Sequence, residues 1–346
     1  MKRRVMSLVA VLLMLGILAG CAGTGAPAAE EPPAVPEAPE APPSEEPLKV
    51  AALLSGPIND MGWNASAYEG LLALEAEFGC EINYAESVEQ SDMEETFRAF
   101  ALQGYDVIFG HGFQFGDAAT RVAEEFPDTH FVVISSDISN GTNLGSANTV
   151  TEDQGFIAGA LAALTSESGV VGGIGGVDIP PIRGPILGCM AGAEYVNPDI
   201  EVIAVLTGSN DDVAKAKETA VTMIENGADV IFANANQAGL GSIEACKEAG
   251  VWAVGSNQDQ NPIAPETVFQ SVIKSTPKLF TYVVEQMING TYEARFHGLG
   301  VREGAIFLSD WHGYDAQLPE VKAEIEKIIE GLKDGSITYD VSKYNL

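Results

Sequence analysis

The chain has 346 residues, and its 49 Asp and Glu outnumber 18 Lys and Arg, which gives a formal net charge of −31. So acidic a protein is not expected to bind nucleic acid, and its four Cys and four His show no C-x-x-C motif or Cys/His cluster of a metal site. The body that follows residue 48, about 300 residues, is too long for one typical core and predicts two lobes.

The amino terminus is predicted to be a secretion signal over residues 1–20. Lys2, Arg3 and Arg4 precede an apolar run at 5–18, and the run is too short to span a membrane comfortably. An ordinary cleaved signal or a membrane helix is the alternative. Because the segment Leu18-Ala19-Gly20-Cys21 is similar to the lipobox of bacterial lipoproteins, we expect a diacylated Cys21 and an anchor on the extracytoplasmic side of a cell membrane.

Residues 21–48 are predicted to be a tether rather than part of a domain. Eight prolines and six glutamates leave almost nothing apolar to pack. We therefore expect an extended spacer that holds the folded body away from the membrane surface.

An internal repeat indicates the fold. The segment Gly104-Tyr105-Asp106-Val107-Ile108-Phe109 recurs as Gly227-Ala228-Asp229-Val230-Ile231-Phe232, and a second apolar run follows each copy, at 130–137 and at 251–259. Short apolar runs separated by helical patterns are typical of parallel strands covered on both faces. We predict an α/β protein of two doubly wound parallel-sheet lobes joined by a hinge, the first lobe comprising 49–149 plus 259–293 and the second 150–258 plus 294–346.

Ligands of such sheets bind beyond the carboxyl ends of the strands, so two facing lobes would enclose a cleft there. Trp63 and Asn64 lie in the first predicted strand-to-helix loop, where an indole face and an amide would suit a planar ligand with polar edges. Alternatively, Trp63 packs on the helix that it introduces.

Other polar and aromatic residues at predicted strand ends are weaker candidates. His111 and Phe113 could contact a planar ligand or form a structural Gly-rich turn, Asp137 could bind a ring N–H or cap a helix, and Asn210 could cap the helix near Val213. Further candidates at such ends are Ser55, Ser135 and Asn234.

An enzyme is not expected. The glycine cluster at 169–178 lacks both G-x-G-x-x-G spacing and a G-K-[ST] ending, so it predicts a buried strand, and no nucleophile elbow or H-E-x-x-H helix occurs. The odd cysteines Cys80, Cys189 and Cys246 predict buried thiols. No catalytic residue, metal or cofactor is assigned.

Several short motifs resemble one family. The first-loop motif D-x-S-F-N-x-x-x-x-E-G is represented by Asp60-Met61-Gly62-Trp63-Asn64 with Glu69-Gly70, a G-x-D-x-D-Q pattern by the segment 255–260, and an S-x-x-K pattern by Ser271 to Lys274. In this order they resemble the basic membrane protein family over about residues 48–320. Its members are lipoproteins of type I periplasmic-binding fold that bind purine nucleosides for ABC importers.

The resemblance implies a role for several residues in a ligand site. Trp63 would stack on a purine, Asn64 would contact the base, and Lys274 with Asn257 would hold ribose hydroxyls; Asp60 belongs to the same motif. Asn257 replaces an aspartate that is usual in the family, and Asn210 stands where a second stacking aromatic is common. A free nucleobase or another planar heterocycle therefore competes with a nucleoside as ligand.

The resemblance implies a monomeric receptor that delivers its small-molecule ligand to an ABC permease. A receptor lipoprotein that presents its closed form to a membrane sensor kinase is the alternative. A surface lipoprotein with a vestigial cleft is a third reading.

Overall fold

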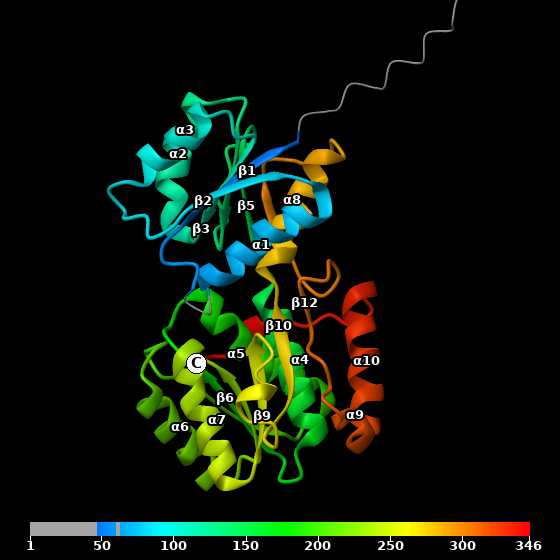
Figure 1. Cartoon of the computed structure of the whole chain (residues 1–346). Helices are drawn as coiled ribbons and strands as arrows, with labels where there is room; N and C mark the ends of the chain where they lie inside the picture. The colour runs from blue at the N-terminus through cyan, green and yellow to red at the C-terminus, as the bar shows by residue number, and fades with distance from the viewer. Residues whose placement is uncertain (1–46, 60–62) are drawn as a thin grey trace, which may run out of the picture. The chain divides into compact units, whose positions relative to one another are not determined.

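The computed structural model describes residues 47–59 and 63–346, and within them the chain forms two α/β lobes, each on its own six-stranded sheet (Figure 1). The predicted signal, Cys21 and nearly all of the tether lie outside the described residues, as does Asp60. None of the helices found in these two ranges is long and apolar enough to cross a membrane.

The first lobe is built on a sheet of strand order β11-β5-β4-β3-β1-β2, with all neighbours parallel. Its strands are β1 (Lys49–Leu54), β2 (Glu81–Ala85), β3 (Val107–His111), β4 (His130–Ile134), β5 (Leu144–Thr149) and β11 (Phe296–Leu299). Its helices are α1 (Trp63–Phe78), α2 (Met93–Leu102), the 3₁₀ turn η1 (Phe113–Phe115), α3 (Gly116–Glu125) and α8 (Thr276–Ile288).

The second lobe repeats this arrangement with the strand order β12-β10-β9-β8-β6-β7, in which only the β10/β12 pair is antiparallel. Its strands are β6 (Val170–Gly175), β7 (Glu201–Leu206), β8 (Val230–Asn234), β9 (Trp252–Asn257), β10 (Val268–Lys274) and β12 (Ile306–Leu308). Its helices are α4 (Thr151–Thr165), α5 (Pro180–Val196), α6 (Val213–Glu225), α7 (Gly239–Ala249), α9 (Tyr314–Gln317) and α10 (Pro319–Asp334), with 3₁₀ turns η2 (Asn236–Ala238), η3 (Asn261–Ile263) and η4 (Val341–Lys343).

Both sheets are covered by helices on both faces, as the apolar strand sequences predict. Every residue of β3 and of β8 is buried, which requires a packed layer on each side. In the first lobe α1 and α8 cover one face while α2 and α3 cover the other. In the second lobe α4, α5 and α10 lie opposite α6 and α7. The predicted fold class is confirmed.

Helices α4 and α5 pack almost backbone to backbone. A Cβ atom added at Gly155 would collide with the carbonyl oxygen of Pro185, and one at Gly192 with that of Phe156. Glycine is therefore required at these contacts because any larger side chain would push the two helices apart.

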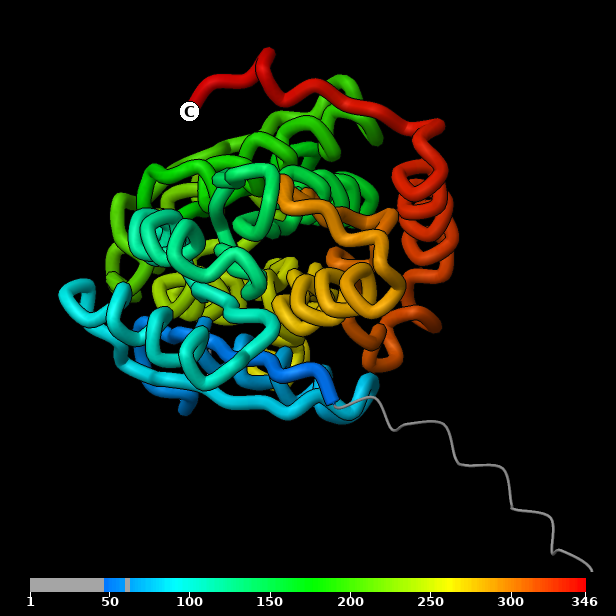
Figure 2. Tube along the Cα trace, turned by 90° about the horizontal axis from the view of Figure 1, so that it is seen from above, coloured from blue at the N-terminus to red at the C-terminus, as the bar shows by residue number. Residues whose placement is uncertain are grey.

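The carboxyl-terminal segment completes the second lobe. The Tyr339 hydroxyl donates to Asp153 of α4 at 2.5 Å, and the Tyr344 hydroxyl donates to Glu194 of α5 at 2.6 Å. Figure 2 shows this segment running along the outside of that lobe. The last residues thus belong to the folded body.

The lobe boundaries differ from the predicted ones. Residues 259–274 were assigned to the first lobe, but β10 pairs in parallel with β9 and antiparallel with β12, so it lies in the second sheet. Residues 294–299 were assigned to the second lobe, whereas β11 pairs with β5 of the first. The polar stretch after β9 was taken for a crossing between lobes, but it forms the short turn η3 and returns to the same sheet.

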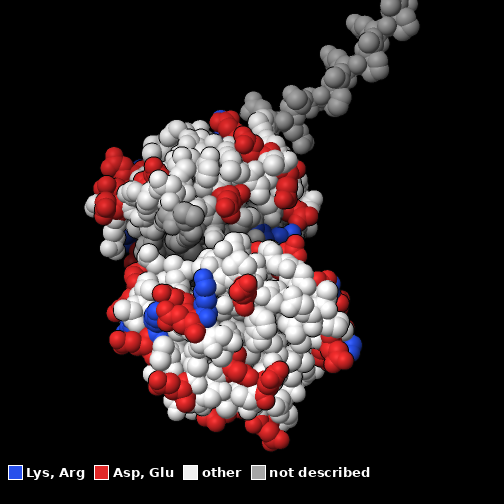
Figure 3. Space-filling model, turned by 60° about the horizontal axis from the view of Figure 1, so that its bottom comes forward, with Lys and Arg blue, Asp and Glu red and all other residues white. Residues whose placement is uncertain are grey.

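The acidic composition is visible on the surface. Figure 3 shows Asp and Glu side chains spread over both lobes, with few Lys and Arg between them. Such a surface favours solubility and disfavours polyanionic partners.

Candidate functional site

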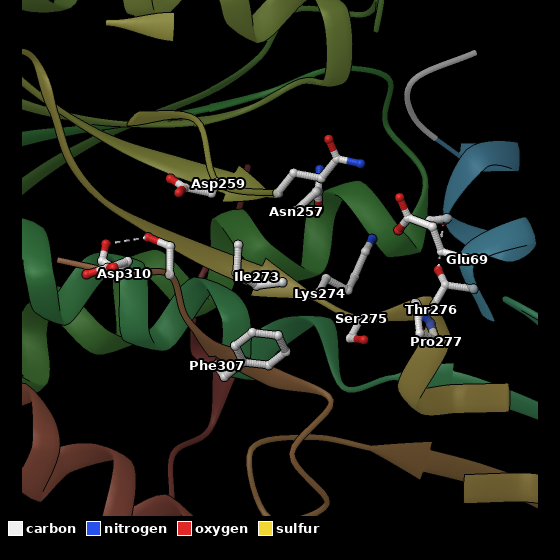
Figure 4. A pocket seen from close by; sticks show the side chains of 13 residues that line it. Glu69, Asn257, Asp259, Ile273, Lys274, Ser275, Thr276, Pro277, Phe307 and Asp310 are labelled. Carbon is white, nitrogen blue, oxygen red and sulfur yellow. Dashed lines mark hydrogen bonds between the residues drawn. The ribbon is translucent and has the colours of Figure 1, made fainter. Parts of the chain in front are cut away.

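A pocket of about 460 Å³ opens where the second lobe meets α1 and α8 (Figure 4). It is lined by Ser66, Glu69, Asn257, Gln258, Asp259, Ile273, Lys274, Ser275, Thr276, Pro277, Phe307, Ser309 and Asp310.

Both lobes contribute to this pocket. Ser66 and Glu69 come from the first two turns of α1, and Thr276 is the first residue of α8; the Ser66 hydroxyl lies 3.1 Å from the Thr276 hydroxyl. Asn257 and Lys274 are the last residues of the neighbouring strands β9 and β10. The pocket therefore lies at the carboxyl ends of parallel strands, where the topology predicts a ligand.

Lys274 is the cation of the pocket. Its side chain is half-buried, and burial lowers the pKa of the ammonium group to about 8, because the charged form is poorly solvated there. Among the described residues no carboxylate lies within ion-pair distance of its Nζ, although Glu69, Asp259 and Asp310 line the same pocket. Asp259 is already engaged, since its Oδ2 lies 2.7 Å from Nε2 of His312.

Asn257 is held from behind by a buried glutamine of α4. Gln154, which is fully buried, donates its Nε2 to the Val272 carbonyl oxygen at 2.9 Å and to Oδ1 of Asn257 at 3.2 Å. Asn257 has a left-handed backbone (φ 67°), a conformation that asparagine tolerates better than most residues. Position 257 is thus fixed in both backbone and side chain.

Trp63 packs against the first lobe. Its ring stacks on the buried His111 with centroids 3.9 Å apart and an angle of 22°, and its Nε1 donates to the His111 carbonyl oxygen at 3.4 Å. The ring also adjoins the apolar cluster beneath α1 and α8. Asn64 is buried and accepts the Gly56 N–H at 3.2 Å. Both residues therefore have structural contacts in addition to their predicted ligand role.

Two more predicted residues lie at the ends of β3 and β8. Phe113 in η1 is 68% exposed, beyond the carboxyl end of β3. Asn234, the last residue of β8, is 2% exposed, and its Nδ2 has no hydrogen-bond partner among the described residues. These residues do not line the pocket of Figure 4.

The remaining predicted residues lie apart from the pocket. Ser55 is exposed after β1, Ser135 follows β4 with φ 58°, and Asp137 is exposed in the loop to β5. No helix begins after Asp137, so its predicted alternative as a cap is wrong. Asn210 accepts the Val177 N–H at 3.1 Å, and the cap of α6 is Asp212, which accepts the Lys215 N–H.

The sequence analysis missed Gln154, which holds Asn257 from behind, and the pocket residues Thr276 and Ser309. Gln154 stands out in retrospect as a polar residue within a run of small and apolar ones in α4, and buried amides of this kind usually serve a specific partner. Thr276 and Ser309 carry no comparable signal.

The three described cysteines agree with the sequence analysis. Cys80, Cys189 and Cys246 are free and buried, and burial raises the pKa of Cys189 and of Cys246 to about 12. Within 47–59 and 63–346 no three His, Cys, Asp or Glu side chains lie together as metal ligands would.

Residues 48–336 match a family model described as "Bmp: ABC transporter substrate-binding protein PnrA-like". The chain belongs to the Bmp family. The predicted family is confirmed, and membership of a family of substrate-binding proteins agrees with the prediction that the chain is not an enzyme.

Two curated relatives and one solved structure support this assignment. The "ABC transporter nucleoside-binding protein BmpA" of Lactococcus lactis subsp. cremoris is 29% identical over 362 positions, covering 98% of this chain and 99% of that protein. The "Transcriptional activator protein med" of Bacillus subtilis is 30% identical over 259 residues, covering 75% of this chain and 80% of that protein.

The solved structure is a solute-binding protein of an ABC transporter system from Aeropyrum pernix K1. It superposes with a TM-score of 0.67 at 22% identity, covering 86% of this chain and 95% of that one. This similarity concerns the fold, which is that of type I periplasmic binding proteins.

Proposed function

We propose that this Bmp-family protein is a lipid-anchored receptor that binds a purine nucleoside or a related planar heterocycle between its lobes and delivers it to an ABC permease. The observation that carries the proposal is the pocket at the ends of β9 and β10, where Lys274 and Asn257 face residues of α1 and α8. An ammonium and an amide at the edge of a cleft provide the few directed polar contacts that orient a small ligand.

The ligand class rests on the relatives and on the aromatic residues of the first lobe. BmpA of Lactococcus lactis is named as nucleoside-binding and aligns along nearly its whole length. Phe113, exposed beyond β3, and Trp63, at the start of α1, are available flat side chains on the same lobe. Because Asn257 replaces the aspartate that is usual in the family, a free nucleobase competes with a nucleoside as the proposed ligand.

We propose that capture requires closure of the two lobes about a hinge. In the described residues the chain passes between the sheets at 149–151, 274–276 and 299–306. Lys274 and Thr276 lie on either side of one such passage, so a rotation there would move the two walls of the pocket against each other. The lobes would then comprise 49–149 plus 275–300 and 150–274 plus 301–346.

The anchor is proposed from the sequence alone. Metabolic labelling of cells with an alkyne fatty acid should modify the wild-type protein, whereas a Cys21→Ser variant should remain unlabelled and be released from the membrane. Equal labelling of both would contradict lipidation at Cys21.

A sensing role is the second candidate, because one relative bears the name of a transcriptional activator. Deleting the permease that receives the ligand should abolish uptake of that ligand if the protein serves transport. If it serves sensing, uptake should persist and ligand-dependent gene expression should require the protein.

The binding proposal is tested by thermal shift of the full chain in detergent against inosine, guanosine, adenosine, their free bases, uridine and ribose. Ligand that binds the native state raises Tm by mass action. A shift with purine compounds alone supports the proposal, with nucleosides and bases ranked by the size of the shift. No shift with any purine would overturn it.

A further inference from the structure

The polarity of the pocket wall formed by β9 and β10 follows from one backbone carbonyl. Val272 O can only accept a hydrogen bond, so the Gln154 atom 2.9 Å away must be the amide nitrogen. The same nitrogen lies 3.2 Å from the Asn257 side chain, which must therefore turn its oxygen toward Gln154. The amide orientation of Asn257 is thus determined by a fixed acceptor.

The consequence is that the free end of the Asn257 side chain is its NH₂ group. Figure 4 shows the ammonium nitrogen of Lys274 on the side of the pocket that faces Glu69. The described residues provide no hydrogen-bond partner for either nitrogen. An ammonium group has three donors and no acceptor, so the free ends of the Lys274 and Asn257 side chains offer donors only.

We propose that this pair of residues selects ligands that carry an acceptor oxygen, such as a carbonyl, carboxylate or phosphate oxygen, rather than a hydroxyl group at that position. A hydroxyl oxygen can accept from Lys274 and Asn257, but its proton then needs a separate acceptor. Because a donor that loses water without gaining a partner is penalised, we expect selectivity of about tenfold or more against the hydroxyl. This inference refines the proposed function by naming the ligand group that the second lobe recognises.

Acceptors do exist elsewhere in the pocket. Asp259 is paired with His312. Asp310, in the loop after β12, lines the same pocket. Glu69 approaches from α1 of the other lobe and is exposed, so it is a described carboxylate that could accept a hydrogen bond from a ligand hydroxyl. The experiment therefore includes Glu69.

The test uses one purine base with two different arms. Hypoxanthine carrying a carboxymethyl arm at N9 ends in acceptors only, while the hydroxyethyl analogue of equal length ends in a hydroxyl. We expect the wild-type full chain to bind the carboxylate at least about tenfold more tightly by calorimetry. Asn257→Asp replaces the donor with a carboxylate and should reverse this preference.

Two further variants separate orientation from charge. Gln154→Leu removes the donor that holds Asn257 while keeping a similar volume, and should reduce the preference severalfold without reversing it. Asn226→Asp adds a negative charge on the exposed end of α6, outside the pocket, and should leave the preference unchanged.

The outcomes are decisive for each idea. Equal binding of the two analogues by the wild type, or a hydroxyl preference that disappears in Glu69→Gln, would overturn the inference while leaving purine binding intact. If no purine binds, the proposed function fails, and a comparison of ribonate with ribose then tests the inference separately. A preference for ribonate that Asn257→Asp reverses would support the inference. No binding of either compound would overturn the inference as well.

Discussion

The segments that follow β3 and β8 have the same backbone plan and different side chains. Each strand ends in a buried polar residue, passes through a three-residue 3₁₀ turn and enters a helix, α3 or α7. In the first lobe the strand ends in His111, which stacks on Trp63, and the turn begins with the exposed Phe113. In the second lobe the equivalent positions are the amides Asn234 and Asn236.

This difference suggests a division between the two sides of the ligand site. In these two turns the first lobe offers aromatic rings, which suit the flat face of a heterocycle, and the second offers amides, which suit its polar edge; the aromatic ring of the pocket lining, Phe307, belongs to the second lobe. The contrast is testable because each side can be altered without the other.

Trp63→Ala is expected to have the largest effect, and on stability rather than on binding alone. The stacking on His111 and the contact with the α1/α8 cluster predict a loss of about 3 kcal/mol, at the lower end for a large aromatic because Trp63 is half-buried. The Tm of the ligand-free protein should fall clearly. An unchanged Tm with abolished binding would show that the indole serves the ligand only.

Lys274→Met should weaken ligand binding by about 2 kcal/mol, or about 30-fold, because it removes a charged donor while keeping the apolar stem. Lys247→Met, on the exposed end of α7, is the control and should bind normally. Since burial lowers the pKa of Lys274 to about 8, binding should also weaken as pH rises through about 8, where the free protein loses this charge. Binding of equal strength at pH 7 and pH 9.5 would contradict a role for the ammonium.

Phe113→Asn makes the first turn resemble the second. If Phe113 stacks on a heterocycle, affinity should fall by about tenfold, since stacking of a base on an aromatic side chain contributes about 1–3 kcal/mol. The ligand-free Tm should stay the same because the ring is 68% exposed. Phe307→Asn, which alters an exposed ring on the second lobe, provides the comparison. If Phe113→Asn lowers the affinity less than Phe307→Asn does, the ring that stacks on the ligand belongs to the second lobe.

The smallest effect concerns acid stability. Burial lowers the pKa of both His130 and His297, two first-lobe residues, so they stay neutral when the unfolded chain already binds protons. Stability should therefore be constant above about pH 7 and decline by roughly 1 kcal/mol as pH falls below the unfolded value near 6.5. Between pH 7.5 and 5.5, Tm should decrease less for the double variant His130→Phe/His297→Phe than for the wild type. An equal decrease of Tm in both proteins would show that other groups cause the loss of stability.

The sequence was sufficient for the fold but not for the details of the site. The repeat around Val107 and Val230 predicted two parallel sheets because buried strands of this kind have a strong local signature. The passage between lobes near residue 258 was misplaced, because β10 is joined to its neighbour by a polar turn that looks like an interdomain connection.

At the site, the sequence identified Asn257 and Lys274 but could not show how they are held. The link from Val272 through Gln154 to Asn257 joins residues 118 and 103 positions apart, and only the packing of α4 on the second sheet brings them together. Trp63 shows the converse problem. It was predicted in a strand-to-helix loop but is the first residue of α1, and its stacking on His111, 48 residues away, depends on the pairing of β1 with β3.

Backbone strain in the loops has a consequence for the thermodynamics of binding. Ser135, Asn236 and Asn257 lie at or just beyond the carboxyl ends of strands and all have positive φ, a conformation that costs most residues about 1 kcal/mol or more. This conformational free energy is part of folding and does not oppose ligand binding. Binding should therefore lose little backbone entropy in these loops. Most of the remaining unfavourable free energy of binding should come from the rigid-body movement of the lobes.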